Sequence, residues 1–247
     1  MPNALIIDIS HHQPDPNWAK LKAGGTIGVI LKATEGTTYV DPTYKKRASA
    51  AKAAGFHVST YHFLKSGNIE AQMDFYVNTV APDEGDRLVI DYEDTKLKLA
   101  DLEAAIKCLW KIAPKCEITI YGANGFLGAQ LKGLKNDILS QTSLWVASYT
   151  SASVPTHREL KGTWPVWSLW QYSDKGRVDG LDVNVDVNRW NGDPAQIPAW
   201  FNAGNVQPNP TPAPEPDFPA PRPTVIVDVK APDGVAIVFS LNGKPFA

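Results

Sequence analysis

The feature that most constrains this chain is the regular alternation of apolar runs with amphipathic segments over residues 4–148. Short runs rich in β-branched residues predict buried strands, and segments with a helical period follow them. The predicted strands span residues 4–9, 26–33, 56–63, 87–92, 117–121 and 143–148. Helices are predicted at 42–54, 69–80 and 99–112, and two shorter ones are expected to begin at the caps Asn17 and Asn124. This order predicts a parallel sheet with right-handed crossovers.

The alternation changes after Tyr149. Residues 166–171 and 181–188 have the composition of strands, but no helical pattern lies between them. The order favours an α/β fold, a TIM-like (β/α)-barrel of about eight strands whose late helices are missing. An open doubly wound sheet is the alternative, but no glycine-rich phosphate loop follows the first predicted strand.

The composition of the chain shifts abruptly from Gln207 onward. Prolines recur at 208, 210, 212, 214, 216, 219, 221 and 223, a spacing that favours polyproline II. Beyond them, residues 224–229 and 235–241 have strand composition and flank the turn Pro232-Asp233-Gly234. We therefore predict a barrel domain at 1–204, a proline-rich linker at 205–223 and a short β-hairpin segment of unknown role at 224–247.

Charge and composition exclude several classes of protein. The formal net charge is −2, so no basic surface indicates a nucleic-acid partner. No apolar run approaches the ~18 residues of a membrane span, so we expect no membrane insertion. Two cysteines, Cys108 and Cys116, are too few for a disulfide scaffold, and we expect two buried thiols. Nothing in the sequence indicates the oligomeric state.

An acidic pair ends the fourth predicted strand. Leu88-Val89-Ile90 is followed by Asp91-Tyr92-Glu93. Side chains alternate along a strand, so Asp91 and Glu93 are predicted to share one face while Tyr92 points to the other. Carboxyl groups two positions apart are expected to come within about 5–5.5 Å, the separation typical of a retaining glycosidase.

Other acidic residues follow neighbouring strands, where the active site of a parallel barrel lies. Asp8 ends the first strand and Glu35 follows the second, while Asp186 belongs to the alternating last strand. A closed barrel places the last strand beside the first, so acids on the last strand are expected to face Asp8. A calcium loop is rejected, because Val187 occupies the position where that loop requires glycine.

Metal and nucleophile chemistry are less favoured. The histidines have no zinc-binding spacing, and neither a HExxH motif nor a Gly-x-Ser-x-Gly elbow is present. Cys108 lies inside a predicted helix, which is a poor place for an exposed nucleophile. We therefore expect no metal and no cofactor, and paired carboxylates as the catalytic groups.

A series of motifs resembles the family 25 glycoside hydrolases, the Chalaropsis-type lysozymes common among phage endolysins. They occur in the family's order over roughly residues 4–190: Asp8-Ile9-Ser10-His11-His12-Gln13-Pro14, Ile30-Leu31-Lys32-Ala33-Thr34-Glu35-Gly36, Tyr61-His62-Phe63, Asp91-Tyr92-Glu93, Trp145-Val146-Ala147-Ser148-Tyr149, Trp170-Gln171-Tyr172 and Val185-Asp186-Val187-Asn188. The resemblance implies an eight-stranded barrel without some late helices. It also implies cleavage, with retention, of the β-1,4 bond between N-acetylmuramic acid and N-acetylglucosamine.

The resemblance also implies roles for individual residues. Glu93 matches the general acid and base, and Asp91 matches a nucleophile or a stabiliser of an oxazolinium ion. Asp8 and Asp186 match the remaining acids of the family site. Neighbouring carboxylates hold a proton on an acid, so we expect Glu93 to have a raised pKa and Asp91 a low one.

Supporting residues complete the predicted site. Glu35 matches a signature glutamate, and Lys32 either pairs with an acid at the mouth or extends along the surface. Tyr61, Tyr149 and Trp170 are the candidates for shaping a sugar groove, and Gln171 belongs to the matching motif beside Trp170.

The expected partner is bacterial peptidoglycan. With no signal peptide ahead of the first strand, we expect delivery to the cell wall by holin-type lysis or another route, as for a phage-encoded enzyme made in the host cytoplasm. A barrel that binds glycans without cleaving them and a glycosidase for another amino-sugar polymer, such as chitin, are the alternatives.

Overall fold

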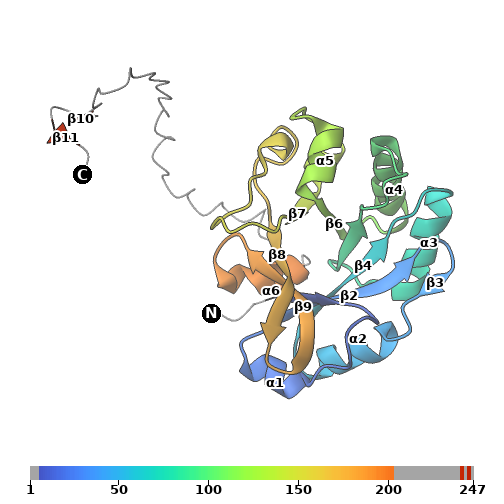
Figure 1. Cartoon of the computed structure of the whole chain (residues 1–247). Coiled ribbons are helices and arrows are strands. Elements are labelled where there is room, and N and C mark those ends of the chain that lie inside the picture. The colour runs from blue at the N-terminus through green and yellow to red at the C-terminus, as the bar shows by residue number, and fades with distance from the viewer. Residues whose placement is uncertain (1–5, 203–239, 242–243, 246–247) are drawn as a thin grey trace. The chain divides into compact units, whose positions relative to one another are not determined.

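The computed structural model of the chain describes residues 6–202, 240–241 and 244–245. A ring of strands lies at the centre of the main part, with helices packed around its outside (Figure 1). The ring consists of β1 (Ile6–Ile9), β2 (Gly28–Glu35), β4 (His57–Phe63), β5 (Arg87–Asp91), β6 (Glu117–Ala123), β7 (Ser143–Ala147), β8 (Leu169–Val178) and β9 (Leu181–Trp190).

The ring closes because β1 pairs on both sides. It runs parallel to β2 and antiparallel to β9, while the steps from β2 through β8 are all parallel. Only β9 is reversed, because it returns from β8 as a hairpin. A short strand, β3 (Tyr39–Val40), adds to the end of β2. The predicted TIM-like barrel of eight strands is confirmed.

Helices follow the early strands and largely disappear after β7. They are α1 (Trp18–Ala23), α2 (Tyr44–Ala53), α3 (Ile69–Val80), α4 (Leu99–Ile112), α5 (Asn124–Leu131) and α6 (Ile197–Phe201), with 3-10 turns η1 (Leu139–Gln141), η2 (Arg158–Leu160) and η3 (Pro194–Gln196). The predicted bounds of α3 and α4 are confirmed. Asn17 caps α1 as predicted, but Asn124 is the first residue of α5, and Ala123 occupies the cap position.

Strand β8 differs most from its prediction. It begins at Leu169 and continues to Val178, whereas residues 166–171 were predicted. The second half of β8 is polar and therefore lacks a strand pattern in the sequence. It is extended because β9 pairs with it along the whole hairpin.

Two apolar cores stabilise the barrel. The larger one fills the space between the strands and the surrounding helices, and it contains Tyr92, Trp164, Trp167 and Trp170. The smaller one fills the inside of the ring.

Helix α6 closes one end of the ring interior. Its residues Ile197, Trp200 and Phe201 belong to the inner core. Beneath it, the Arg87 Nε donates to the Trp200 carbonyl at 2.5 Å, and the guanidinium lies 4.6 Å from the Trp200 ring centre. Gly28 is required here, because a Cβ at that position would lie 2.5 Å from the Phe201 ring.

The C-terminal segment forms its own unit. By its internal contacts the chain divides into residues 1–213 and 214–247. In the second unit, β10 (Ser240–Leu241) pairs antiparallel with β11 (Lys244–Pro245). The predicted linker, the boundaries at 204 and 223 and most of the predicted hairpin lie outside the described residues, and the three-part division stays a prediction.

The two cysteines are free and partly buried, so the predicted thiols are confirmed but their full burial is not. Within the residues that the structure describes, no helix is both long and apolar enough to cross a membrane.

Deleting residues 206–247 is expected to leave the melting temperature of the barrel unchanged within about 2 °C. Residues 6–202 supply both the closed ring and its α6 plug. Ending the chain at residue 193 is the matched comparison, because it also removes α6 and exposes the inner core. Thermal unfolding followed by circular dichroism distinguishes the two truncations, and an insoluble 1–205 chain would show that the tail belongs to the barrel.

Candidate active site

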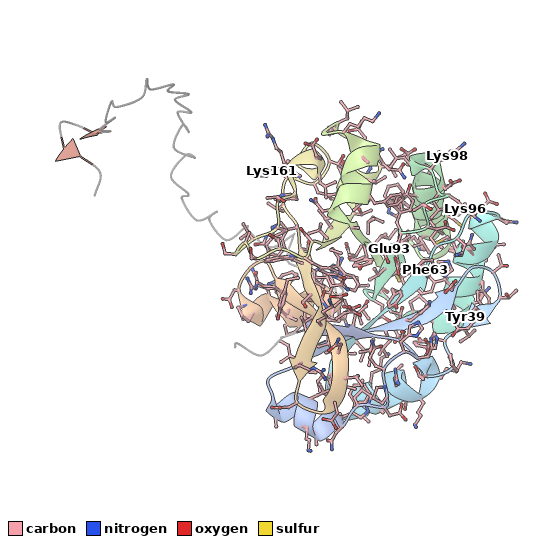
Figure 2. All side chains as sticks on the ribbon, in the orientation of Figure 1. Tyr39, Phe63, Glu93, Lys96, Lys98 and Lys161 are labelled. Carbon is pink, nitrogen blue, oxygen red and sulfur yellow. The ribbon has the colours of Figure 1, made fainter. Side chains whose placement is uncertain are left out.

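A polar cavity of about 230 Å³ lies at the carboxyl ends of the barrel strands. Figure 2 shows Glu93 near the middle of the ring of strands, with Phe63 close to it. The cavity is lined by Asp8, Tyr61, Asp91, Glu93, Tyr121, Trp145, Tyr149, Gln171 and Asp186. All four predicted catalytic acids are therefore brought together, and Tyr61, Tyr149 and Gln171 accompany them.

The end of β5 positions the central acid pair. Asp91 is the last residue of the strand and is 5 % exposed, whereas Glu93 lies beyond the strand end and is exposed at the cavity mouth. Tyr92 points to the other side and is buried in the outer core, as predicted. The cavity thus has one carboxyl on its floor and one at its entrance.

The carboxyl groups of Asp91 and Glu93 lie close enough for each to affect the pKa of the other. Strand β5 ends at Asp91, so Glu93 lies beyond the extended strand on which the separation of about 5–5.5 Å is based, and that separation stays a prediction.

Both acids of the pair have raised pKa values. Burial raises the pKa of Asp91 well above its ordinary value, and the neighbouring Glu93 charge raises it further. Partial burial also raises the pKa of Glu93. The prediction for Glu93 is confirmed in direction, whereas the predicted low pKa of Asp91 is wrong, because desolvation outweighs the nearby Lys32 charge.

Asp8 and Asp186 face each other across the closing seam of the barrel. They are register partners in the β1–β9 pair, as predicted for the first and last strands. Asp8 is 6 % exposed, and burial, with the Asp186 charge as the next cause, raises its pKa well above the ordinary value.

Two side-chain amides hold the Asp8 carboxyl. The Gln171 Nε2 lies 3.1 and 3.2 Å from its two oxygens, and the Asn188 Nδ2 donates to Oδ2 at 2.7 Å. Each amide oxygen is held in turn. Tyr121 and Tyr149 hydroxyls donate to Gln171 Oε1 at 2.8 and 2.7 Å.

The Trp145 indole N–H donates to Asn188 Oδ1 at 2.7 Å. Because an indole nitrogen is only a donor, this contact fixes the Asn188 amide with its NH₂ toward Asp8. Tyr121, Trp145 and Asn188 were missed as site residues. Strand alternation gives the missing signal, since Trp145 and Ala147 share the inward face of β7, and Tyr121 is the register partner of Trp145.

Lys32 and Glu35 lie outside the residues that line the cavity. The Lys32 Nζ donates to Glu35 Oε2 at 2.7 Å and lies 5.1 Å from the Phe63 ring centre. Of the two predictions for Lys32, pairing with an acid is the one that the structure bears out.

Trp170 does not face the cavity, contrary to its predicted place in the sugar groove. It lies in the outer core against Trp167 and Tyr172, and its indole N–H donates to the Ser148 carbonyl at 2.7 Å. The cause is strand alternation, because Gln171 takes the inward position on β8 and Trp170 therefore takes the outward one. Tyr121 and Trp145 occupy the cavity wall instead.

The described residues include no group of three or more His, Cys, Asp or Glu side chains arranged to hold a metal ion.

Comparison with known proteins identifies the family. The sequence profile of the glycosyl hydrolases family 25 matches residues 7–181. The chain belongs to glycosyl hydrolase family 25. Lysozyme M1 of Streptomyces globisporus is 28% identical over 212 residues, which cover 79% of this chain and 70% of that protein. N,O-diacetylmuramidase of Chalaropsis sp is 27% identical over 185 residues, covering 68% and 86%.

Solved structures of lysozymes and muramidases have a fold similar to that of this family 25 member. The bacterial lysozyme from Streptomyces coelicolor superposes with a TM-score of 0.67 at 28% identity, covering 80% of this chain and 96% of that one. A muramidase from Trichobolus zukalii gives a TM-score of 0.64 at 25% identity, covering 80% and 98%. The predicted family and the predicted glycoside hydrolase class are both confirmed.

Asp186 gives this family 25 enzyme a testable pH dependence. Burial, with the charges of Asp174 and Glu93, raises the pKa of Asp186 to about 6. A carboxyl whose pKa is raised on folding contributes stability below its unfolded pKa and loses that contribution as the pH rises through the folded value. The ionised form of Asp186 therefore opposes folding at neutral pH.

Asp186→Asn is accordingly expected to raise the melting temperature at about pH 7.5 and to change it little at about pH 4, where Asp186 is protonated. Thermal unfolding of wild type and variant across this range tests the prediction. Asp182→Asn on the same strand is the control, because Asp182 is exposed and outside the cavity lining. A gain of the same size at both pH values would contradict the electrostatic cause.

Proposed function

We propose that this family 25 enzyme is a lysozyme that cleaves the β-1,4 bond between N-acetylmuramic acid and N-acetylglucosamine in bacterial peptidoglycan, with retention. The observation that carries the proposal is the Asp91–Glu93 pair, two carboxyls with raised pKa values in a cavity lined by two further acids. A protonated carboxyl at neutral pH is the group that a glycosidase needs to protonate a leaving oxygen.

Glu93 acts as general acid and then as general base. It lies at the mouth, where a glycosidic oxygen can reach it, and partial burial raises its pKa. It donates its proton to the N-acetylglucosamine oxygen as the C1–O bond of the muramic acid residue breaks. It then takes a proton from the water that attacks the same carbon, which returns the carboxyl to its starting state.

Asp91 assists the acetamido group of the substrate. Its Oδ1 is buried and has no hydrogen-bond partner within the described residues. An acetamido N–H of the muramic acid residue supplies such a partner, while the acetamido oxygen attacks C1 to form an oxazolinium ion. Two displacements at C1, first by this oxygen and then by water, give net retention. This assignment favours stabilisation of the oxazolinium over direct attack by Asp91.

Asp8 and Asp186 complete the electrostatic environment. The Gln171 and Asn188 amides orient the Asp8 carboxyl, and Asp186 stands opposite it at the seam. In their ionised form these carboxyls favour the positive charge that develops on the sugar ring in the transition state. Tyr61, Tyr121 and Trp145 provide aromatic surface along the cavity wall for the sugar itself.

The site of action follows from the substrate. The enzyme acts on the bacterial cell wall, and holin-type lysis from a host cytoplasm is the delivery that we propose. Two phage relatives, the lysozymes of Streptococcus phages Cp-9 and Cp-1, are 29% and 28% identical to this chain over 180 and 185 residues. Those stretches cover 51% of each phage protein.

Reducing-end analysis tests the bond assignment. Purified peptidoglycan is digested, the fragments are reduced with borohydride, and the terminal sugar is identified by mass spectrometry. The proposal predicts muramitol ends from peptidoglycan and little release from chitin under the same conditions. Glucosaminitol ends would show that a different bond is cleaved, and equal cleavage of chitin would show that the substrate is not specifically peptidoglycan. Binding to peptidoglycan without any release would favour a glycan-binding barrel.

A further inference from the structure

A row of alternating cationic and aromatic side chains borders the cavity on the β2–β4 side. We call Lys32, Tyr39, Phe63 and Lys65 the β2–β4 rim. The Lys32 Nζ lies 5.6 Å from the Tyr39 ring centre and 5.1 Å from that of Phe63, and the Lys65 Nζ lies 5.3 Å from the Phe63 ring centre. These contacts link the four side chains into one continuous surface.

The rim directly continues the wall of the cleavage site. Phe63 stands two positions after Tyr61 on β4, so strand alternation places both on the inward face. Tyr61 lines the cavity, and Phe63 is the register partner of Asp91. Figure 2 shows Phe63 next to Glu93 and Tyr39 farther along the same side. A glycan that extends from Glu93 toward β2 and β4 would lie against this rim.

Tyr39 of the rim is fixed by a hydrogen bond and is also exposed to solvent. The Tyr39 hydroxyl lies 3.2 Å from His11 Nδ1, and that nitrogen lies 3.0 Å from the buried Asp41 carboxylate. Tyr39 is nevertheless 38 % exposed. An aromatic ring that is fixed by its hydroxyl and open on its surface loses little entropy when a ligand covers it.

The two lysines differ in how fully their charges are paired. Lys32 is buried and contacts Glu35 at 2.7 Å, which neutralises it. Lys65 is 44 % exposed, and its nearest carboxylate oxygens, on Asp94 and Glu35, lie 3.7 and 4.0 Å away. Lys65 thus retains hydrogen-bonding capacity toward an incoming anion.

The opposite wall of the cavity is acidic. Asp8 and Asp186 stand on β1 and β9, and Asp174 on β8 is close enough to raise the pKa of Asp186. A substrate with a carboxylate on one edge therefore meets repulsion at the β9 wall, whereas on the β2–β4 side the exposed Lys65 ammonium is available to pair with it.

We propose that the β2–β4 rim binds the anionic peptide that a muramic acid residue carries through its lactyl ether, with Lys65 pairing with a peptide carboxylate and Tyr39 and Phe63 packing on the lactyl group and adjoining chain. This inference rests on the muramidase function proposed above and extends it to the peptide part of the substrate.

The test compares two soluble glycan substrates, one with its stem peptides and one stripped of them by an amidase. Lys65→Met keeps most of the apolar stem and removes the charge. We expect its KM to rise about fivefold on peptide-bearing chains, with added salt weakening the wild-type preference, and to stay at the wild-type value on stripped chains. Lys65→Arg is expected to restore binding, and Lys65→Glu to weaken it further.

Lys115→Met is the matched control, because Lys115 is an exposed lysine paired with Glu84 in the α4–β6 connection. It is expected to leave both KM values unchanged. An equal KM increase on both substrates for Lys65→Met, or none on either, would overturn the inference while the muramidase function stands. Failure of the wild-type enzyme to cleave either glycan would instead overturn the proposed function, and the inference with it.

Discussion

Glu93→Gln is expected to lower kcat on peptidoglycan by about 10³-fold or more, roughly 4 kcal/mol in activation free energy. The amide keeps the volume of the side chain but cannot deliver a proton to the leaving oxygen. Because Glu93 lies exposed at the cavity mouth, the melting temperature is expected to stay near that of the wild type. Release of soluble fragments from purified peptidoglycan measures the effect.

Glu35→Gln is the matched control for this experiment. The family resemblance also points to Glu35, but this residue pairs with Lys32 and lies outside the residues lining the cavity. The same chemical change there is expected to cost less than about tenfold in kcat. Near-normal turnover by Glu93→Gln, or a larger loss in Glu35→Gln, would remove Glu93 from the role of general acid.

Asp91→Asn is expected to lower kcat by about 10²-fold or more, ~2.7 kcal/mol. The asparagine keeps the shape, but it cannot carry the negative charge that stabilises an oxazolinium ion. Initial rates on peptidoglycan test this directly. A loss smaller than about tenfold, ~1.4 kcal/mol, would make Asp91 a structural residue.

The acetamido assignment for Asp91 has its own test. If the substrate's acetamido group attacks C1, then wild-type enzyme is expected to lose about 10²-fold in rate on chemically N-deacetylated glycan chains, and Asp91→Asn should add little further loss. Unchanged wild-type turnover on such chains would identify Asp91 as a direct nucleophile.

Much of the fold follows from local sequence pattern. The bounds of α3 and α4 are predicted well because each has a long apolar face, and α3 begins at a cap, Asn68, that its own sequence supplies. The missing helical pattern between the last two strands corresponds to the β8–β9 hairpin, which returns β9 to pair with β1 in the closure of the ring. The pairing of Asp8 with Asp186 is a consequence of that closure.

The errors have a common physical origin in contacts between distant segments. The second half of β8 is polar and becomes a strand only because β9 pairs with it. Trp170 and Trp145 are equally apolar in sequence, and only the registers of β7 and β8 decide that Trp145 faces the cavity. Burial of Asp91, which sets its pKa, depends on the closed ring as a whole.

The anomeric form of the first product tests the central claim most directly. Proton NMR of a soluble peptidoglycan fragment, recorded within the first minutes of cleavage, shows which anomer of the new reducing end is released before mutarotation. Retention through the Asp91–Glu93 pair predicts that the β-anomer of N-acetylmuramic acid appears first and the α-anomer grows in later. Initial release of the α-anomer would contradict retention and require a water bound between two separated carboxylates.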